Sequence, residues 1–216
     1  MDSSTITLRM RDVTSALGAA AEYRQTLNRI RLQKFVYLMD AVAVIFNTLP
    51  PSEGHYTFKH GPFDPAVQNA VDSLAFRGLV TITKLAQGEE GTISADYTLS
   101  EAGEDYFQRL LAHDAGAHRV VVAREVALRI QRIGWRRLKE LVYAEPTFLK
   151  ARAGGYNRRL VTYNGRQVST GRLLQIITRS LSTQGIRPTR EIVLDAYFEY
   201  LDKYARQPHH LAGGTA

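Results

Sequence analysis

Apolar residues are most densely arranged between Leu27 and Phe46 (LNRIRLQKFVYLMDAVAVIF). From Phe35 onward they occupy every side of a helix, and a helix that is apolar on all sides is a buried one. The segment also contains charged residues, Lys34 and Asp40 among them, which disfavour a membrane span. We therefore expect residues 27–46 to form the core helix of the first half of the chain.

Shorter patterns surround this helix. Residues 13–23 have a weak helical pattern that Gly18 limits. Residues 56–59 alternate as a strand, and the HGP sequence that follows is typical of a turn. Asp64 before Pro65 is typical of a helix N-cap with proline at the first helical position. We therefore expect a strand, a turn and a helix after the core helix.

Two strand-like segments, residues 79–85 and 93–99, are separated by the turn-forming sequence QGEEGT. Ser100 then predicts the N-cap of another helix. The resulting order of helix, strand, helix, two-stranded hairpin and helix is the layout of a winged helix. We therefore predict a winged-helix-like domain over residues 1–115.

The second half has mainly helical periodicity, so the predicted fold class is mainly α with short β-hairpins. Pro146 is expected to end or kink one helix, and Asn164-Gly165 is a strong signal for a hairpin turn. We predict a basic helical domain over residues 116–206 with a hairpin near residues 160–168, and a disordered tail over residues 207–216. The predicted helices of this half cover residues 116–133, 135–149, 170–184 and 188–204.

Charge divides the chain at the same place. The 216 residues have a formal net charge of +7. Residues 1–115 contain 10 Lys and Arg against 14 Asp and Glu, whereas residues 116–190 contain 16 Lys and Arg against 3 Asp and Glu. Such a basic block favours binding to nucleic acid or to an acidic protein. The shift in charge predicts a domain boundary near residues 113–116.

The most informative part of the basic block is residues 151–167 (ARAGGYNRRLVTYNGRQ), because no acidic residue occurs between Lys150 and Arg190. Cations neutralise phosphates and tyrosine rings stack on bases, so this composition predicts a nucleic-acid interface. A solvated, arginine-rich loop is the alternative. The predicted phosphate-binding residues are Arg129, Arg132, Arg136, Arg137, Lys139, Arg152, Arg158, Arg159, Arg166, Arg172 and Arg179, with Tyr156 and Tyr163 as stacking residues.

Two motifs in the first half suggest a family. The sequence RLQKFVYL at residues 31–38, followed by YxFxHGPF at residues 56–63, resembles the Panacea antitoxin-like family of prokaryotic proteins. The resemblance covers residues 27–110. It implies a neutralising or scaffolding role rather than catalysis, in loci that contain toxins, phage genes or mobile elements. The motif residues are Leu32, Lys34, Tyr37, His60, Gly61 and Pro62.

Familiar motifs for catalysis and metal binding are absent from the sequence. The pairs His55/His60 and His113/His118 lack the helical i, i+4 spacing and the companion carboxylates of metal sites. The sequence has no nucleophile elbow and no glycine-rich phosphate loop, and the absence of cysteine excludes thiolate chemistry and suits a reducing cytoplasm. We therefore expect a cytoplasmic protein that is not an enzyme, with no catalytic residues, metal or cofactor.

The leading hypothesis is a non-catalytic nucleic-acid-binding protein of a prokaryotic regulatory, defence or mobile-element system, with DNA favoured over RNA. The helix before the predicted wing has Gln68 and Asn69 but no cation on its exposed face, and the wing tip has Glu89 and Glu90. That part is poorly suited to phosphate.

The alternative hypothesis is an antitoxin-like or adaptor protein whose partner is a toxin or a complex subunit. The partner would bind the acidic winged helix or the basic second half. The tyrosine stripe of the last helix, which includes Tyr197, Tyr200 and Tyr204, predicts core packing, with a homodimer interface as its alternative. No membrane partner is expected.

Overall fold

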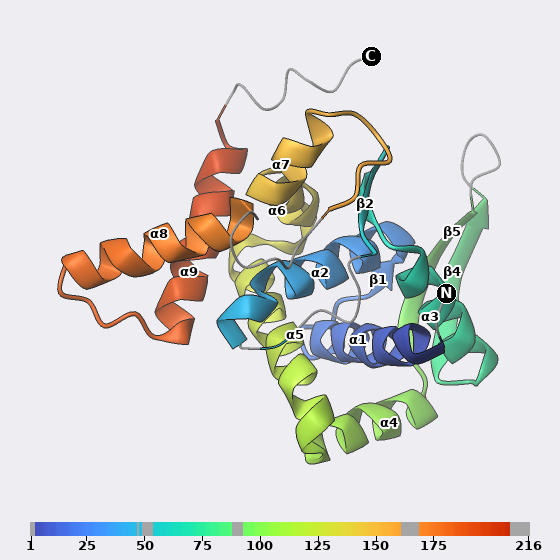
Figure 1. Ribbon diagram of the computed structural model, residues 1–216. Helices are drawn as coiled ribbons and strands as arrows, with labels where there is room; N and C mark the ends of the chain where they lie inside the picture. The colour runs from blue at the N-terminus through green and yellow to red at the C-terminus, as the bar shows by residue number, and fades with distance from the viewer. Residues whose placement is uncertain (1–2, 47, 49–53, 88–92, 161–168, 208–216) are drawn as a thin grey trace.

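The computed structural model describes residues 3–46, 48, 54–87, 93–160 and 169–207, and is mainly helical with a small antiparallel sheet (Figure 1). This confirms the predicted fold class. The predicted hairpin turn at Asn164-Gly165, the wing tip with Glu89 and Glu90, and nearly all of the predicted tail lie outside the described residues.

The predicted core helix is α2, Arg29–Val42, which continues as the 3₁₀ helix η1, Ala43–Phe46. Its start differs from the prediction, because Leu27 and Asn28 form the short strand β1. Asn28 is the N-cap of α2, and its side chain accepts a hydrogen bond from the backbone N–H of Arg31 at 2.9 Å. Capping chemistry therefore places the helix start two residues after the beginning of the apolar pattern.

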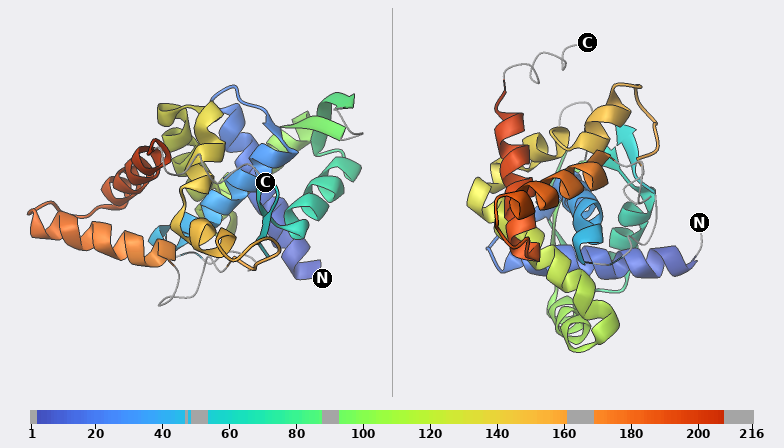
Figure 2. Two further views of the ribbon diagram at one scale, coloured as in Figure 1. Left: turned by 90° about the horizontal axis from the view of Figure 1, so that it is seen from above. Right: turned by 60° about the vertical axis from the view of Figure 1, so that its left-hand side comes forward.

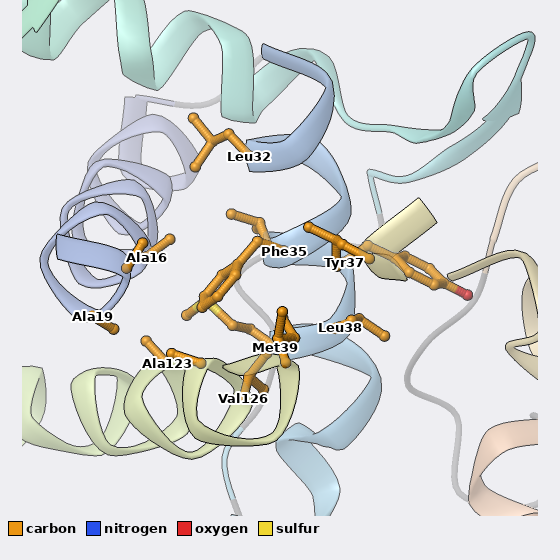
Figure 3. Packing of buried hydrophobic residues seen from close by; sticks show 14 of the residues in the cluster. Ala16, Ala19, Leu32, Phe35, Tyr37, Leu38, Met39, Ala123 and Val126 are labelled. Carbon is orange, nitrogen blue, oxygen red and sulfur yellow. The ribbon is translucent and has the colours of Figure 1, made fainter. Parts of the chain in front are cut away.

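Helix α2 packs between α1, Ser3–Ala21, and α5, Asp114–Ile133. Phe35 and Met39 are fully buried among small side chains of these two helices, whereas Tyr37 points to the opposite side of α2 (Figure 3). Burying a side chain such as that of Phe35 contributes about 1.5–3 kcal/mol. The apolar pattern of the sequence thus identified the centre of the core.

Helix α1 is longer than the weak pattern of residues 13–23 predicted. Arg9 and Asp12 interrupt the apolar pattern, but both are buried and paired with each other at 2.9 Å. Gly18 does not limit the helix either. A Cβ at this position would lie 2.6 Å from ring atoms of Phe107, so glycine allows α1 and α4, Glu101–Ala112, to approach closely.

The predicted wing strands are β4, Val80–Gln87, and β5, Ile93–Leu99. Together with β1 they form an antiparallel sheet in the order β1-β5-β4, in which Leu27 lies opposite Tyr97. Strand β5 is therefore central, and β4 is at the edge of the sheet. The strand before α2 consequently pairs with the second strand of the predicted hairpin.

The predicted helix caps of the first half are confirmed. The side chain of Asp64 accepts a hydrogen bond from the backbone N–H of Ala66 at 2.8 Å at the start of α3, Pro65–Phe76. Ser100 accepts one from Gly103 at 3.1 Å at the start of α4. Both caps depend on chemistry within three residues, which the sequence displays directly.

The single helix predicted over residues 135–149 is divided into three pieces. Gly134, with a φ of 110°, ends α5 and is followed by the 3₁₀ helix η3, Trp135–Arg137, and by α6, Leu138–Tyr143. Glu145 then caps α7, Pro146–Arg152. The proline therefore begins a new helix rather than kinking a continuous one.

Residues from both halves of the chain share one hydrophobic cluster, which contains Leu38, Val126 and Leu201. The last two helices, α8, Ser169–Thr183, and α9, Arg190–Ala205, extend from one side of this core (Figure 2). The boundary near residue 115 thus separates blocks of charge around a shared core. A division into separately folding domains stays a prediction.

Candidate nucleic-acid interface

The basic segment that follows α7 runs along strand β2, Tyr56–Phe58, which pairs with β3, Gly61–Phe63 (Figure 1). The backbone N–H of Thr57 donates to the carbonyl oxygen of Arg158 at 2.8 Å, and its hydroxyl oxygen accepts from the N–H of Arg158 at 2.9 Å. The backbone N–H of Leu160 donates to the carbonyl oxygen of His55 at 2.7 Å. These bonds bring the arginines of the second half beside a turn that belongs to the first half.

Three cations surround the half-buried ring of Tyr143 at the end of α6. The centroid of the ring lies 5.1 Å from Cζ of Arg152, 5.6 Å from Nζ of Lys139 and 5.8 Å from Nζ of Lys34. The ring also stacks on Phe148, with centroids 5.3 Å apart. Cations are attracted to the face of an aromatic ring, so the ring gathers positive charge from three separate helices. We call Tyr143, Lys34, Lys139 and Arg152 the Tyr143 cluster.

Lys34 is the least exposed cation of the cluster, with a relative exposure of 2 %. Its ammonium donates a hydrogen bond to the backbone carbonyl oxygen of His60. Burial lowers the pKa of Lys34 to about 8, and the nearby charge of Lys139 contributes to the shift. The two motifs of the Panacea resemblance therefore touch each other, since Lys34 belongs to the first and His60 to the second.

Gly61 lies directly against the contact between Lys34 and Tyr143. Its φ is 110°, a conformation that favours glycine. A Cβ there would lie 3.0 Å from Nζ of Lys34 and 3.2 Å from Cε1 of Tyr143. The turn between β2 and β3 is thus fitted against the Tyr143 cluster.

The electrostatic surroundings of the cluster are positive. Partial burial lowers the pKa of the exposed His60, and Lys59, Lys34 and Lys139 lower it further. Within the described ranges, no carboxylate forms an ion pair with Lys34, Lys139 or Arg152. Burial raises the pKa of Tyr143 and Glu140 adds to the shift, so one carboxylate is nearby, although no ion pair between it and these cations is described. Cations without an ion-pair partner are suited to an anionic group such as phosphate.

Several predicted phosphate ligands have other partners. Arg129, only 3 % exposed, pairs with Glu125 and lies 3.0 Å from Asp195 of α9. Arg132 lies 3.2 Å from the same Asp195. Both were expected to face solvent; Arg129 is instead buried between α5 and α9, whereas Arg132 is exposed and still pairs across to α9. Arg137 is paired in the same way with Asp202 of α9. Arg129 and Arg137 thus already have carboxylate partners, and Arg132 has one while remaining exposed, so the part of all three in a nucleic-acid interface stays a prediction.

The other predicted residues lie at different places in the structure. Lys139 and Arg152 belong to the Tyr143 cluster, and Arg158, Arg159 and the stacking candidate Tyr156 are exposed next to β2. Arg136 is exposed on η3, and Arg172 and Arg179 are exposed on α8. Arg166 and Tyr163 lie outside the described residues. Sequence reasoning missed Tyr143, for which the available signal was its i, i+4 spacing from Lys139.

A buried ion network lies apart from this surface, and the sequence analysis did not detect it. Nη2 of Arg9 lies 2.7 Å from Asp40 and 2.9 Å from Asp64. Arg119 lies 2.6 Å from Asp12 and 2.7 Å from Asp40. The network connects α1, α2, α5 and the start of α3 inside the protein, where such pairs need complete mutual satisfaction. Its position indicates a structural role.

A second buried polar group explains the motif residue Tyr37. Its hydroxyl donates to Glu145, which also accepts from the hydroxyl of Thr170 and from the N–H of Phe148 at 2.9 Å. Burial raises the pKa of Glu145, and these donors counteract the shift. The remaining motif residues Leu32 and Pro62 are buried. Tyr37 thus joins α2 to α8 and to α7, which contains Arg152 of the Tyr143 cluster.

The described part of the chain has neither a metal-binding cluster nor a membrane-spanning helix. No group of His, Cys, Asp and Glu side chains there is arranged to hold a metal ion. None of its helices combines the length and apolarity needed to cross a bilayer.

No protein-family model matches this chain, and no curated protein matches it significantly. The resemblance to the Panacea antitoxin-like family therefore rests on its two motifs and stays a prediction.

Proposed function

We propose that this chain is a non-catalytic nucleic-acid-binding protein whose interface is the surface around the Tyr143 cluster, β2 and the segment after α7. The observation that carries the proposal is the convergence of Lys34, Lys139 and Arg152 on one ring without a carboxylate partner among the described residues. Each phosphate that such cations neutralise releases bound counterions and so favours association.

The neighbouring exposed residues support the same function. Arg158 lies beside Thr57 of β2, and the exposed ring of Tyr156 precedes it by two residues. A tyrosine beside cations provides a stacking surface for an unpaired base, whatever its identity. The surface therefore offers both phosphate contacts and a base contact, with positioning rather than chemistry as its task.

Two features of the first half support a winged-helix interpretation. Along the chain, a helix, a strand and a helix precede the two strands β4 and β5, and in space the sheet has the order β1-β5-β4. We place the interface away from α3 all the same. The amide of Gln68 on this helix donates to Asp72 at 2.9 Å, so one candidate base contact already has an acidic partner. DNA remains the first ligand to test, because the basic surface provides phosphate contacts independent of α3.

The test is binding of the purified protein to random duplex DNA and to single-stranded RNA across about 50 to 200 mM salt. The test variant carries both K139A and R158A, which remove two exposed cations of the surface. The matched control pairs R172A with R179A, which removes the same charge from α8. We expect the slope of log K against log salt on duplex DNA to fall in magnitude by about 2 in the variant and to stay unchanged in the control. Equal slopes in the variant and the wild type, or no binding at low salt, would reject the proposal.

A second candidate function, binding of an acidic protein partner, is favoured by exposed apolar side chains. Phe76 is 94 % exposed at the end of α3, and Ile176 is 63 % exposed on α8. Arg172, Ile176 and Arg179 lie at i, i+4 and i+7, so α8 presents an apolar residue between two cations on one face. Such a face is typical of helix-mediated protein contacts.

An adaptor or antitoxin-like role predicts a stoichiometric partner in the native host. Replacing Ile176 by Asp should then abolish co-purification of that partner and leave nucleic-acid binding intact. Retention of the partner by this variant would count against a role for α8.

A further inference from the structure

The contacts described for Lys34 satisfy its buried ammonium only in part. An ammonium has three N–H donors, and the only hydrogen bond described for Lys34 is to the carbonyl oxygen of His60. A buried charge is costly unless it is paired and hydrogen-bonded. Methionine or leucine would fill the same space without that cost. The arrangement is therefore suited to an anion that enters the cluster and completes it.

The geometry of the cluster limits the kind of anion. A nucleic-acid backbone is linear, and the exposed Arg158 and Arg159 beside β2 extend the basic surface along which it would run. Within that surface, Lys34, Lys139 and Arg152 lie 5.1–5.8 Å from the centroid of one ring, so three charges are gathered around a single residue. A phosphate monoester carries a charge of about −1.5 to −2 and three acceptor oxygens, more than a phosphodiester link supplies. A convergent cluster of three cations is matched by a monoester.

We propose that Lys34, Lys139 and Arg152 form a site for a terminal phosphate monoester. The group comes either from the phosphorylated end of a nucleic-acid strand or from a free nucleotide or inorganic phosphate. The strand-end source rests on the proposed function, whereas the site itself does not. The exposed Tyr156, four residues after Arg152, is the candidate for stacking on the base next to a terminal phosphate.

The experiment compares otherwise identical single-stranded oligonucleotides with a 5′-phosphate, a 3′-phosphate or hydroxyl ends at about 100 mM salt. Inorganic phosphate and adenosine monophosphate are titrated separately, with adenosine and acetate as controls. We expect one of the phosphorylated ends to bind at least about tenfold more tightly than the hydroxyl end. We also expect weak binding of both free phosphates and none of adenosine or acetate.

The variants assign the effect to the cluster. K34M removes the buried ammonium, and R152Q and K139Q alter the two cations that are less buried and thus carry less risk to folding. All three should lose the preference for the phosphorylated end, while the charge control R172A with R179A keeps it. Far-UV circular dichroism identifies any variant that fails to fold, and R152Q and K139Q then decide the assignment.

The outcomes separate this proposal from the function on which it rests. Equal binding of phosphorylated and hydroxyl ends with a steep salt dependence overturns the monoester site and leaves nucleic-acid binding standing. Binding of free phosphate without binding of any oligonucleotide supports the site and rejects the proposed function. A preference for the phosphorylated end that survives all three substitutions overturns the assignment to the Tyr143 cluster.

Discussion

Nη2 of Arg9 lies 2.7 Å from Oδ2 of Asp40, and both side chains are wholly buried. Arg119 contacts the other oxygen of Asp40, and Nε2 of His55 lies 3.0 Å from Oδ2. Burial alone would raise the pKa of Asp40, but Arg9, Arg119 and His55 outweigh it and hold the pKa well below its usual range. Asp40 is thus the ionised centre that connects α2 to α1, α5 and the segment before β2.

Replacing Asp40 by Asn should destabilise the protein by about 3–5 kcal/mol, because it leaves Arg9 and Arg119 buried with too little negative charge. The free energy of unfolding from urea denaturation at pH 7 measures this. D105N, at an exposed position on α4, is the control and should change the free energy by less than about 0.5 kcal/mol. Similar losses in the two variants would show that the ion network contributes little.

The same carboxylate predicts a sensitivity to acid. Because its folded pKa lies below the ordinary value of 3.8, the stability from Asp40 is complete above that value and is lost as the pH falls below it. Wild-type protein should therefore lose stability below about pH 4 more steeply than D40N. Parallel curves of unfolding free energy against pH would contradict this.

Contacts could be predicted from the sequence only where the two partners are close together along the chain. Asp64 and Ser100 were recognised as caps because their partners lie within three residues. Tyr143 is more than a hundred residues from Lys34, so their contact could not be read from periodicity. The sequence displayed each motif, but it did not predict that the two motifs would contact the basic second half of the chain.

The ion-pair partners of Arg129 and Arg137 were missed for a different reason. Periodicity places Arg129 and Arg137 outside the apolar stripe of their own helices, but it does not show that α9 covers them. The signal that was available is the acidic row of α9, whose Asp195 and Asp202 match those cations in charge. From the sequence alone, an arginine that binds phosphate cannot be distinguished from one that pairs with a neighbouring helix.

Tyr37→Phe should cost about 1.5–3 kcal/mol in unfolding free energy, because the buried carboxyl of Glu145 loses a hydrogen-bond donor. The pKa of Glu145 is already raised by burial, and losing Tyr37 should raise it further. A raised folded pKa means that stability falls as pH rises above the ordinary value of 4.5, so Y37F should fall more steeply than wild type. Y106F, in α4, is the control, and equal slopes would contradict the role of Tyr37.

Gly61→Ala should destabilise the protein by about 1–3 kcal/mol and weaken phosphate binding. The matched control is G134A, since Gly134 has the same φ of 110° but nothing within 4 Å of a Cβ. Both variants should lose stability through backbone strain, whereas only G61A should displace Lys34 from Tyr143. Urea denaturation and titration with inorganic phosphate separate the two effects. Equal loss of phosphate binding in both variants would show that the contact with Lys34 has no part in it.

Lys34→Met should change how stability depends on pH. Because the folded pKa of Lys34 is about 8 and its ordinary value is 10.5, the unfolded chain binds more protons between these values. Wild-type stability should therefore rise with pH across this window, by about 3 kcal/mol in total. K34M should lack this rise, which unfolding free energies measured from pH 7 to 10.5 would reveal.

The control for this prediction is K150M, at an exposed lysine of α7, which should follow the wild-type curve because it leaves Lys34 in place. Below pH 8 the folded protein carries the cost of a charged, buried ammonium, and a bound phosphate would offset that cost. Added phosphate should consequently stabilise wild-type protein at pH 7 more than at pH 9.5, and should not stabilise K34M at either pH. A K34M curve that rises like the wild type would mean that the ammonium of Lys34 is solvated rather than buried.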